Sequence, residues 1–233
     1  MIDALSEIVG AAVEIEAGKR ADFAQLAPLL GALAKLGITS AGQACAFLYR
    51  KRAVENFEIL LEELRQGKVP VDYVVPPDHA AAVLLRVHRA SLEGTARVNL
   101  RLMAQVIRGQ LEQKNLVADR FLYFADILAG LRREEIVLLG AILNLDKSMP
   151  AVETKPVVYM WKGLSAKLLG TSLFPDEQTI ETYCFSVVRF GLLSQGVRGK
   201  RLAFGATPVL PTSILRELAA FIDIESSVSA EPN

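Results

Sequence analysis

The chain has 233 residues, of which 52% are hydrophobic and 22% are charged. This length suffices for one large domain or two small ones with a real core. Lys plus Arg and Asp plus Glu balance at 26 each, which excludes a surface that is basic all over but leaves room for a local nucleic-acid patch.

The N-terminal part contains the segment with two open interpretations, Phe23–Tyr49, whose only charged residue is Lys35. Its length suits a membrane span, and the basic run Arg50-Lys51-Arg52 would anchor it at the cytoplasmic side. Pro28 and several glycines divide the segment, which instead favours two short buried helices. We expect the second arrangement and keep the first as an alternative.

Two stretches follow with opposite character. Residues from about Ser40 to Arg65 carry a helical apolar stripe, and Gln66–Asp78 breaks the pattern with a glycine and three prolines. Asp78 is then a suitable N-cap for the next helix.

The longest helical pattern runs from Ala80 to about Lys114. Its apolar positions, with Met103 and Val106 in the middle, fall on one side. Four arginines fall on the other side: Arg86, Arg97, Arg101 and Arg108. This stripe is a candidate surface for phosphates or an acidic partner, and its alternative is a solvated face paired to Glu93 and Glu112.

The sequence of the second half of the chain predicts short helices and one hairpin. Helical patterns cover Asp119–Leu131, Arg133–Leu145, Met160–Leu169 and Glu177–Phe190. Asp176 is the expected N-cap of the last of these, and Gly191 its end. Leu192–Gln195 and Leu202–Phe204 flank a Gly-bounded turn, Gly196–Gly199, as a hairpin does. A final helix is expected over about Ser213–Ile222.

The helix ending in "RFGLLSQ", the hairpin, and the "TP" before a last helix resemble a winged-helix arrangement. The resemblance implies a mostly α protein: a helical bundle with a small winged-helix-like C-terminal module carrying one short β-hairpin. We expect an N-terminal helical segment (1–66), a central bundle (67–131), the winged-helix-like module (132–224) and a flexible tail (225–233).

The whole chain also resembles bacterial helical proteins of the Abi-alpha-like type, some of which are linked to phage defence. The similarity lies in "RKRAVENFEILLEEL", "ARVNLRLMAQVI", "DRFLYFADILAGLRREEIVLL" and the terminal "TP" helix. None of these phrases carries a catalytic residue, so the resemblance implies no chemistry to transfer.

No set of residues with catalytic or metal-binding spacing is found in the sequence. His79 and His88 lie nine apart without a nearby cysteine or paired acid, and Asp126 stands among apolar residues as a solvated or salt-bridged helix position. Cys45 and Cys184 are expected to be buried, reduced thiols. We therefore expect no cofactor, no metal and no enzymatic activity.

Three functions remain open. The favoured one is a protein-interaction or self-association module of the bacterial cytoplasm, connected through the resemblance to defence. The second is a DNA-binding regulator that uses the basic wing residues Arg198, Lys200 and Arg201. The acids Asp176 and Glu177 at the start of the candidate recognition helix disfavour it. The third is a membrane-associated protein that inserts Phe23–Tyr49.

Overall fold

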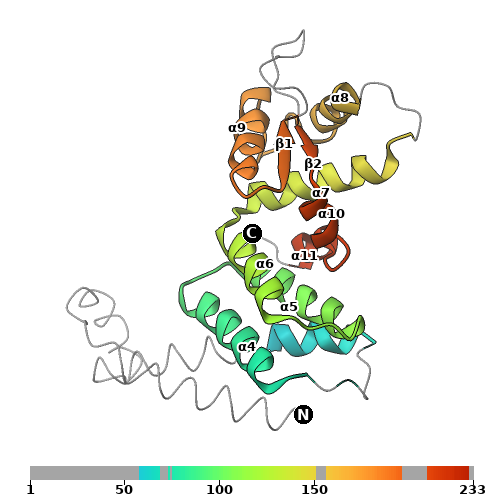
Figure 1. Cartoon of the computed structure of the whole chain (residues 1–233). Helices are drawn as coiled ribbons and strands as arrows, with labels where there is room; N and C mark the ends of the chain where they lie inside the picture. The colour runs from blue at the N-terminus through green and yellow to red at the C-terminus, as the bar shows by residue number, and fades with distance from the viewer. Residues whose placement is uncertain (1–57, 69–72, 74, 151–155, 196–208, 231–233) are drawn as a thin grey trace, which may run out of the picture.

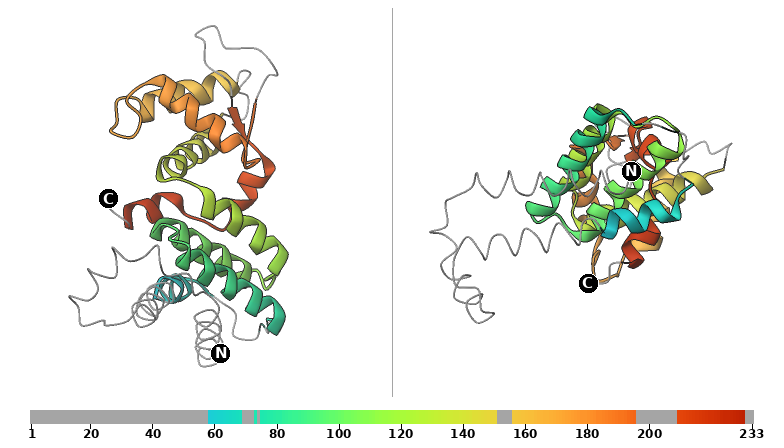
Figure 2. Two further views of the ribbon diagram at one scale, coloured as in Figure 1. Left: turned by 90° about the vertical axis from the view of Figure 1, so that its left-hand side faces the viewer. Right: turned by 90° about the horizontal axis from the view of Figure 1, so that it is seen from below.

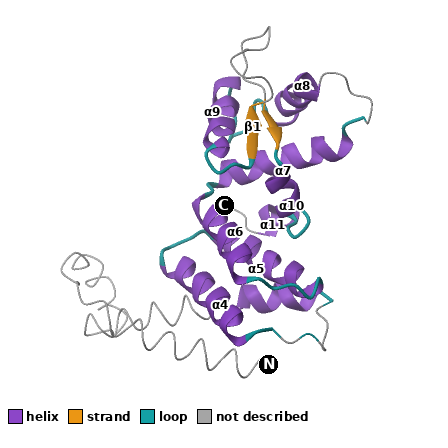
Figure 3. Cartoon of the chain, in the orientation of Figure 1, coloured by secondary structure: helices purple, strands orange, loops and turns teal. Residues whose placement is uncertain are grey.

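The computed structural model describes residues 58–68, 73, 75–150, 156–195 and 209–230 (Figure 1). Within them the protein is mostly helical, with a small antiparallel pair of strands (Figure 3). The prediction of a mostly α protein with one short hairpin is confirmed at this level. The predictions for Phe23–Tyr49 and Cys45 concern positions outside the described residues.

The predicted continuous helix over Ala80–Lys114 is wrong, because two helices take its place. α4 covers Pro77–Leu92 and α5 covers Arg97–Glu112. Gly94 separates them with φ +85°, in the left-handed region that glycine adopts without steric cost. α4 begins with Pro76 as its N-cap, so Asp78 lies in the first turn and is not the cap.

α5 is the central helix of the fold, and it is buried on all sides. Every residue from Val98 to Ile107 is buried, and Met103 and Val106 have no exposed surface. α4, α6 (Ala118–Gly130) and α11 (Ile224–Ala230) pack against it. Burial of the apolar stripe is confirmed for its residues in α5, whereas Leu85 of the same predicted stripe is 49% exposed on α4. The opposite face of α5 is not open to solvent.

α7 (Arg133–Ser148) organises the second half of the described chain. It contacts α8 (Pro156–Leu168), α9 (Glu177–Val188), the second strand and α11. Figure 1 shows α4, α5 and α6 in the lower part of the molecule and α7, α8, α9 and the strands above them. The predicted helices in this region are confirmed, with ends that differ by a few residues.

The small sheet joins β1 (Leu193–Gln195) to β2 (Val209–Pro211) in antiparallel register, with Ser194 opposite Leu210. The first strand was predicted correctly. The strand paired to it is Val209–Pro211, not Leu202–Phe204, which lies outside the described residues. Proline is tolerated at Pro211 because this strand has only one neighbour within the described sheet.

The C-terminal prediction is wrong in two places. The expected helix over Ser213–Ile222 ends early, since α10 covers Ser213–Leu218. The expected flexible tail instead contains α11, which runs to Ala230 and packs on both α5 and α7 (Figure 2). Tertiary contacts hold this polar segment in place, so its sequence alone does not reveal it.

Buried polar contacts fix α11 against α5. Gln105 is 2% exposed; its side-chain oxygen accepts from the backbone N–H of Asp223 at 2.7 Å, and its Nε2 lies 3.1 Å from the Ser227 hydroxyl. Buried polar groups that find such partners specify one arrangement of the helices. Among the described helices, none has both the length and the apolar character that a membrane span requires.

Candidate interaction surfaces

The four arginines proposed as a binding stripe do not lie on one open face. Arg101 is buried, and its guanidinium contacts the carboxylates of Glu62 at 2.9 Å and Glu63 at 3.0 Å. Arg108 contacts the second oxygen of Glu63 at 2.9 Å. The expectation of a solvated stripe is therefore wrong for Arg101, because acids on the helical residues 58–66 cover it.

The other two arginines are in different surroundings. Arg86 forms an ion pair across to α6, with its Nε 2.8 Å from the Asp126 carboxylate. This pair confirms that Asp126 is a salt-bridged helix position, and its carboxylate is 70% exposed. Arg97 is exposed at the start of α5. The wing residues Arg198, Lys200 and Arg201 lie outside the described residues.

The residue that sequence reasoning missed in this region is Glu63. Its carboxylate is almost completely buried and receives a guanidinium at each oxygen. A carboxylate in a dry environment needs such pairing to remain ionised. In the sequence, the buried ion pairs are indicated only by the two adjacent acids Glu62 and Glu63. No local pattern links these acids to arginines about forty positions later.

The local sequence of α9 explains where this helix begins. The Asp176 side chain accepts hydrogen bonds from the Thr179 hydroxyl and the Thr179 backbone N–H, both at 2.7 Å. These two bonds, the side-chain one first, hold the pKa of Asp176 below its ordinary value. The predicted N-cap is confirmed.

The inward face of α9 is attached to α7 by polar as well as apolar contacts. Ile180, Cys184 and Val187 are buried. Glu135, which is 0% exposed, accepts from the backbone N–H of Arg132 at 2.7 Å and from the Ser186 hydroxyl. Glu135 is thus both a cap of α7 and the polar anchor of α9.

The buried face of α9 includes the free thiol of Cys184. Burial, with a smaller contribution from the Glu181 carboxylate, raises the pKa of this thiol to about 12, so it stays protonated and unreactive at neutral pH. We expect iodoacetamide at pH 8 to label Cys184 only after denaturation, in a Cys45→Ala background that leaves one thiol.

The raised pKa of Cys184 also makes the free energy of unfolding depend on pH. The unfolded thiol ionises near 9.0 and the folded thiol near 12. Between these values the unfolded state binds fewer protons, so the free energy of unfolding falls as the pH rises. Fast labelling of the folded protein, or no difference from a Cys184→Ala variant above pH 9, would contradict the burial of this thiol.

The outward face of α9 presents an aromatic side chain. Phe185 is 43% exposed, and it lies at helical spacing from the exposed residues Gln178, Thr182 and Arg189. We call these four residues the α9 face. Among the described residues, three other large hydrophobic side chains are exposed elsewhere: Leu85, Tyr123 and Leu169. The other exposed residues at helical spacing from Phe185 are polar, as Asp119 and Asp126 are around Tyr123 on α6.

The described residues contain no group of three or more His, Cys, Asp or Glu side chains placed to hold a metal ion. Comparison with protein-family models, with curated proteins and with solved structures found no match. The function must therefore be inferred from the surfaces themselves.

Proposed function

We propose that the chain is a non-enzymatic interaction protein and that residues 132–224, as a winged-helix-like module, bind a protein through the α9 face. The observation that supports this proposal most directly is the exposed ring of Phe185 at the centre of that face. Interface hot spots combine a large anchor residue with a polar rim that excludes water. Gln178 and Thr182 would form that rim, with Arg189 at its edge, where its guanidinium lies 3.6 Å from the Glu135 carboxylate and over the Phe190 ring.

The second candidate is a DNA-binding regulator, favoured by the basic residues Arg198, Lys200 and Arg201 in the wing position of the sequence. Two features of α9 weigh against it. Its N-terminus carries Asp176 and Glu177, where a helix entering the major groove would meet phosphates. Phe185 also offers no group that hydrogen-bonds a base edge.

The test compares two aspartate substitutions at similarly exposed hydrophobic positions. Phe185→Asp should abolish co-purification of a stoichiometric protein partner with the tagged chain from its native cell. Leu85→Asp, on α4 and 49% exposed, should leave the partner bound. The free energy of unfolding of both variants should lie within about 0.5 kcal/mol of the parent value, because neither position is in the core.

Two results would contradict this proposal. One is a partner that remains bound to Phe185→Asp at parental affinity. The other is duplex DNA bound more tightly than the non-specific range of about 10⁻⁴–10⁻⁶ M at physiological salt. If changing Arg198, Lys200 and Arg201 to Ala removed that tight DNA binding, the second candidate function would replace the first.

A further inference from the structure

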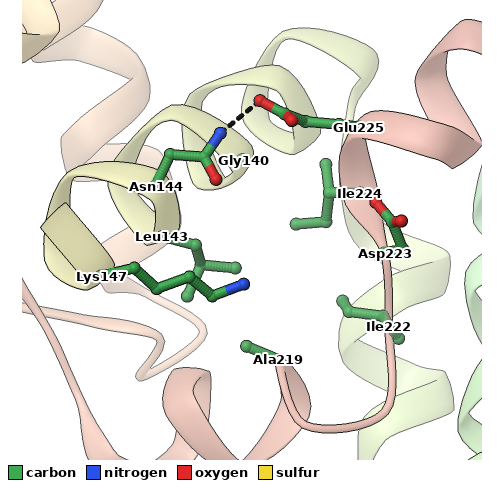
Figure 4. Close-up of a pocket in the computed structure, with 9 residues that line it drawn as sticks. All are labelled: Gly140, Leu143, Asn144, Lys147, Ala219, Ile222, Asp223, Ile224 and Glu225. Carbon is green, nitrogen blue, oxygen red and sulfur yellow. Dashed lines mark hydrogen bonds between the residues drawn. The ribbon is translucent and has the colours of Figure 1, made fainter.

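A cavity of about 310 Å³ lies between the end of α7 and the segment that joins α10 to α11 (Figure 4). Its apolar wall includes Leu143, Ile222 and Ile224. The volume is at the lower end of the range of about 300–1,000 Å³ that small-molecule sites occupy. The cavity is open to solvent on one side, since Lys147, Asp223 and Glu225 in its lining are exposed, and it offers a polar rim around a short apolar wall. It is separate from the α9 face.

One side of the cavity carries an unused positive charge. Lys147 lines it from the last turn of α7. In Figure 4 its amino group points into the open space between Leu143 and Ile222. Within the described residues Lys147 forms no ion pair or hydrogen bond, although Asp146 beside it pairs with Arg216 at 2.8 Å. The cavity thus offers a cation to whatever enters it.

The opposite end of the cavity carries negative charge. Oε1 of Glu225 accepts from the Asn144 amide and lies 3.5 Å from the Lys167 amine. Its other oxygen, Oε2, has no partner among the described residues. Asp223 also lines the cavity, and its Oδ1 accepts from the Ser226 backbone N–H at 3.0 Å. An acceptor for a ligand cation is therefore available at Glu225.

We propose that this cavity binds a free α-amino acid with a small apolar side chain. The ligand carboxylate would pair with the Lys147 amine, its ammonium group with Glu225, and its side chain would pack on Leu143, Ile222 and Ile224. Each charged contact would be a charge-assisted hydrogen bond.

The mixed charge of the cavity selects a zwitterion over ligands with a single charge. A simple carboxylic acid would satisfy Lys147 but would face the carboxylates of Asp223 and Glu225. A simple amine would satisfy Glu225 but would leave Lys147 without a partner. In a molecule with both charges, the carboxylate lies beside Lys147 and the ammonium group lies beside Glu225. Such pairing of opposite charges gives specificity.

The position of the cavity gives binding a structural effect. One wall is α7 and the other is the segment that leads into α11, which also packs on α5. A ligand held between them would stabilise α11 against α7. We therefore expect ligand binding to raise the melting temperature of the whole chain, because a ligand that binds only the folded state stabilises it.

The experiment measures the melting temperature of the full chain and its binding isotherm by calorimetry, with alanine, valine and leucine as probes. 4-Methylpentanoate lacks the ammonium group of leucine, and 3-methylbutylamine lacks its carboxylate. At least one amino acid should bind, with each single-charge analogue about tenfold weaker, the effect of losing one charged hydrogen bond. The substitutions Lys147→Met and Glu225→Gln should each lower the affinity for the amino acid by a similar factor.

The control variant is Lys162→Met, which removes an exposed lysine on α8 away from the cavity and should bind like the parent. The proposal is overturned if none of the three amino acids binds, or if an analogue binds as tightly as its amino acid. It is also overturned if Lys147→Met retains parental affinity while melting normally.

Discussion

Replacing Val106 with aspartate is expected to abolish folding. Val106 lies in the middle of α5 and is 0% exposed, so a carboxylate there would be buried without a partner. Burying an unpaired charge costs several kcal/mol, a large part of the roughly 5–15 kcal/mol by which domains are stable. Circular dichroism and size-exclusion chromatography should report an unfolded or aggregated chain.

Leu85→Asp is the matched control, since it adds the same charge at a half-exposed position of α4. It should keep the helical spectrum and elute like the parent. If Val106→Asp also folds and melts like the parent, then α5 is not the centre of the core.

Replacing Glu63 with alanine is expected to cost about 3–5 kcal/mol, the usual loss when one partner of a buried ion pair is removed. The Glu63 side chain is only 2% exposed and bridges Arg101 to Arg108. Its removal would leave Arg108 without this carboxylate and Arg101 with fewer acceptors in a dry site. Urea denaturation should show the loss as a lower midpoint.

Glu62→Ala provides the comparison, because Glu62 contacts the same Arg101 but its side chain is 56% exposed. An exposed ion pair contributes about 0–1 kcal/mol, so this variant should unfold close to the parent. Equal losses for the two variants would mean that the Glu63 carboxylate is not buried between the arginines.

The parts of the fold that local sequence determines were predictable. α6, α7 and α9 have apolar residues at helical spacing, and α9 also begins at the cap Asp176. It ends at Val188, three residues before Gly191, whose φ of +71° lies in the left-handed region. In each case the cause lies within a few residues of its effect, which is the range that periodicity and capping rules cover.

The errors arose where distant residues decide the structure. The apolar pattern continues across Gly94, so it does not reveal that the chain turns there. The charge pattern of α5 resembles a solvent face because the acids that bury Arg101 are about forty positions earlier. α11 is polar and short, and its place depends on contacts such as that between Gln105 and Ser227.

The candidate surfaces also depend on contacts between distant residues, which local sequence patterns do not predict. The stripe of arginines was visible as spacing, but the spacing does not say whether acids from another helix cover it. Phe185 was one apolar residue among several in α9, and only the packing of Ile180 and Val187 against the rest of the module leaves its ring exposed. The cavity at Lys147 joins two segments about eighty positions apart, which no local pattern connects.

The packing of α11 on α5 also sets an order for protein synthesis. Among the described residues, the Gln105 side chain finds its partners in Asp223 and Ser227, which the ribosome adds 118 and 122 residues later. Until then, α5 lacks α11, which is one of the helices that cover it. The central helix therefore completes its packing only after these distant residues have been synthesised, so folding cannot simply follow the growing chain.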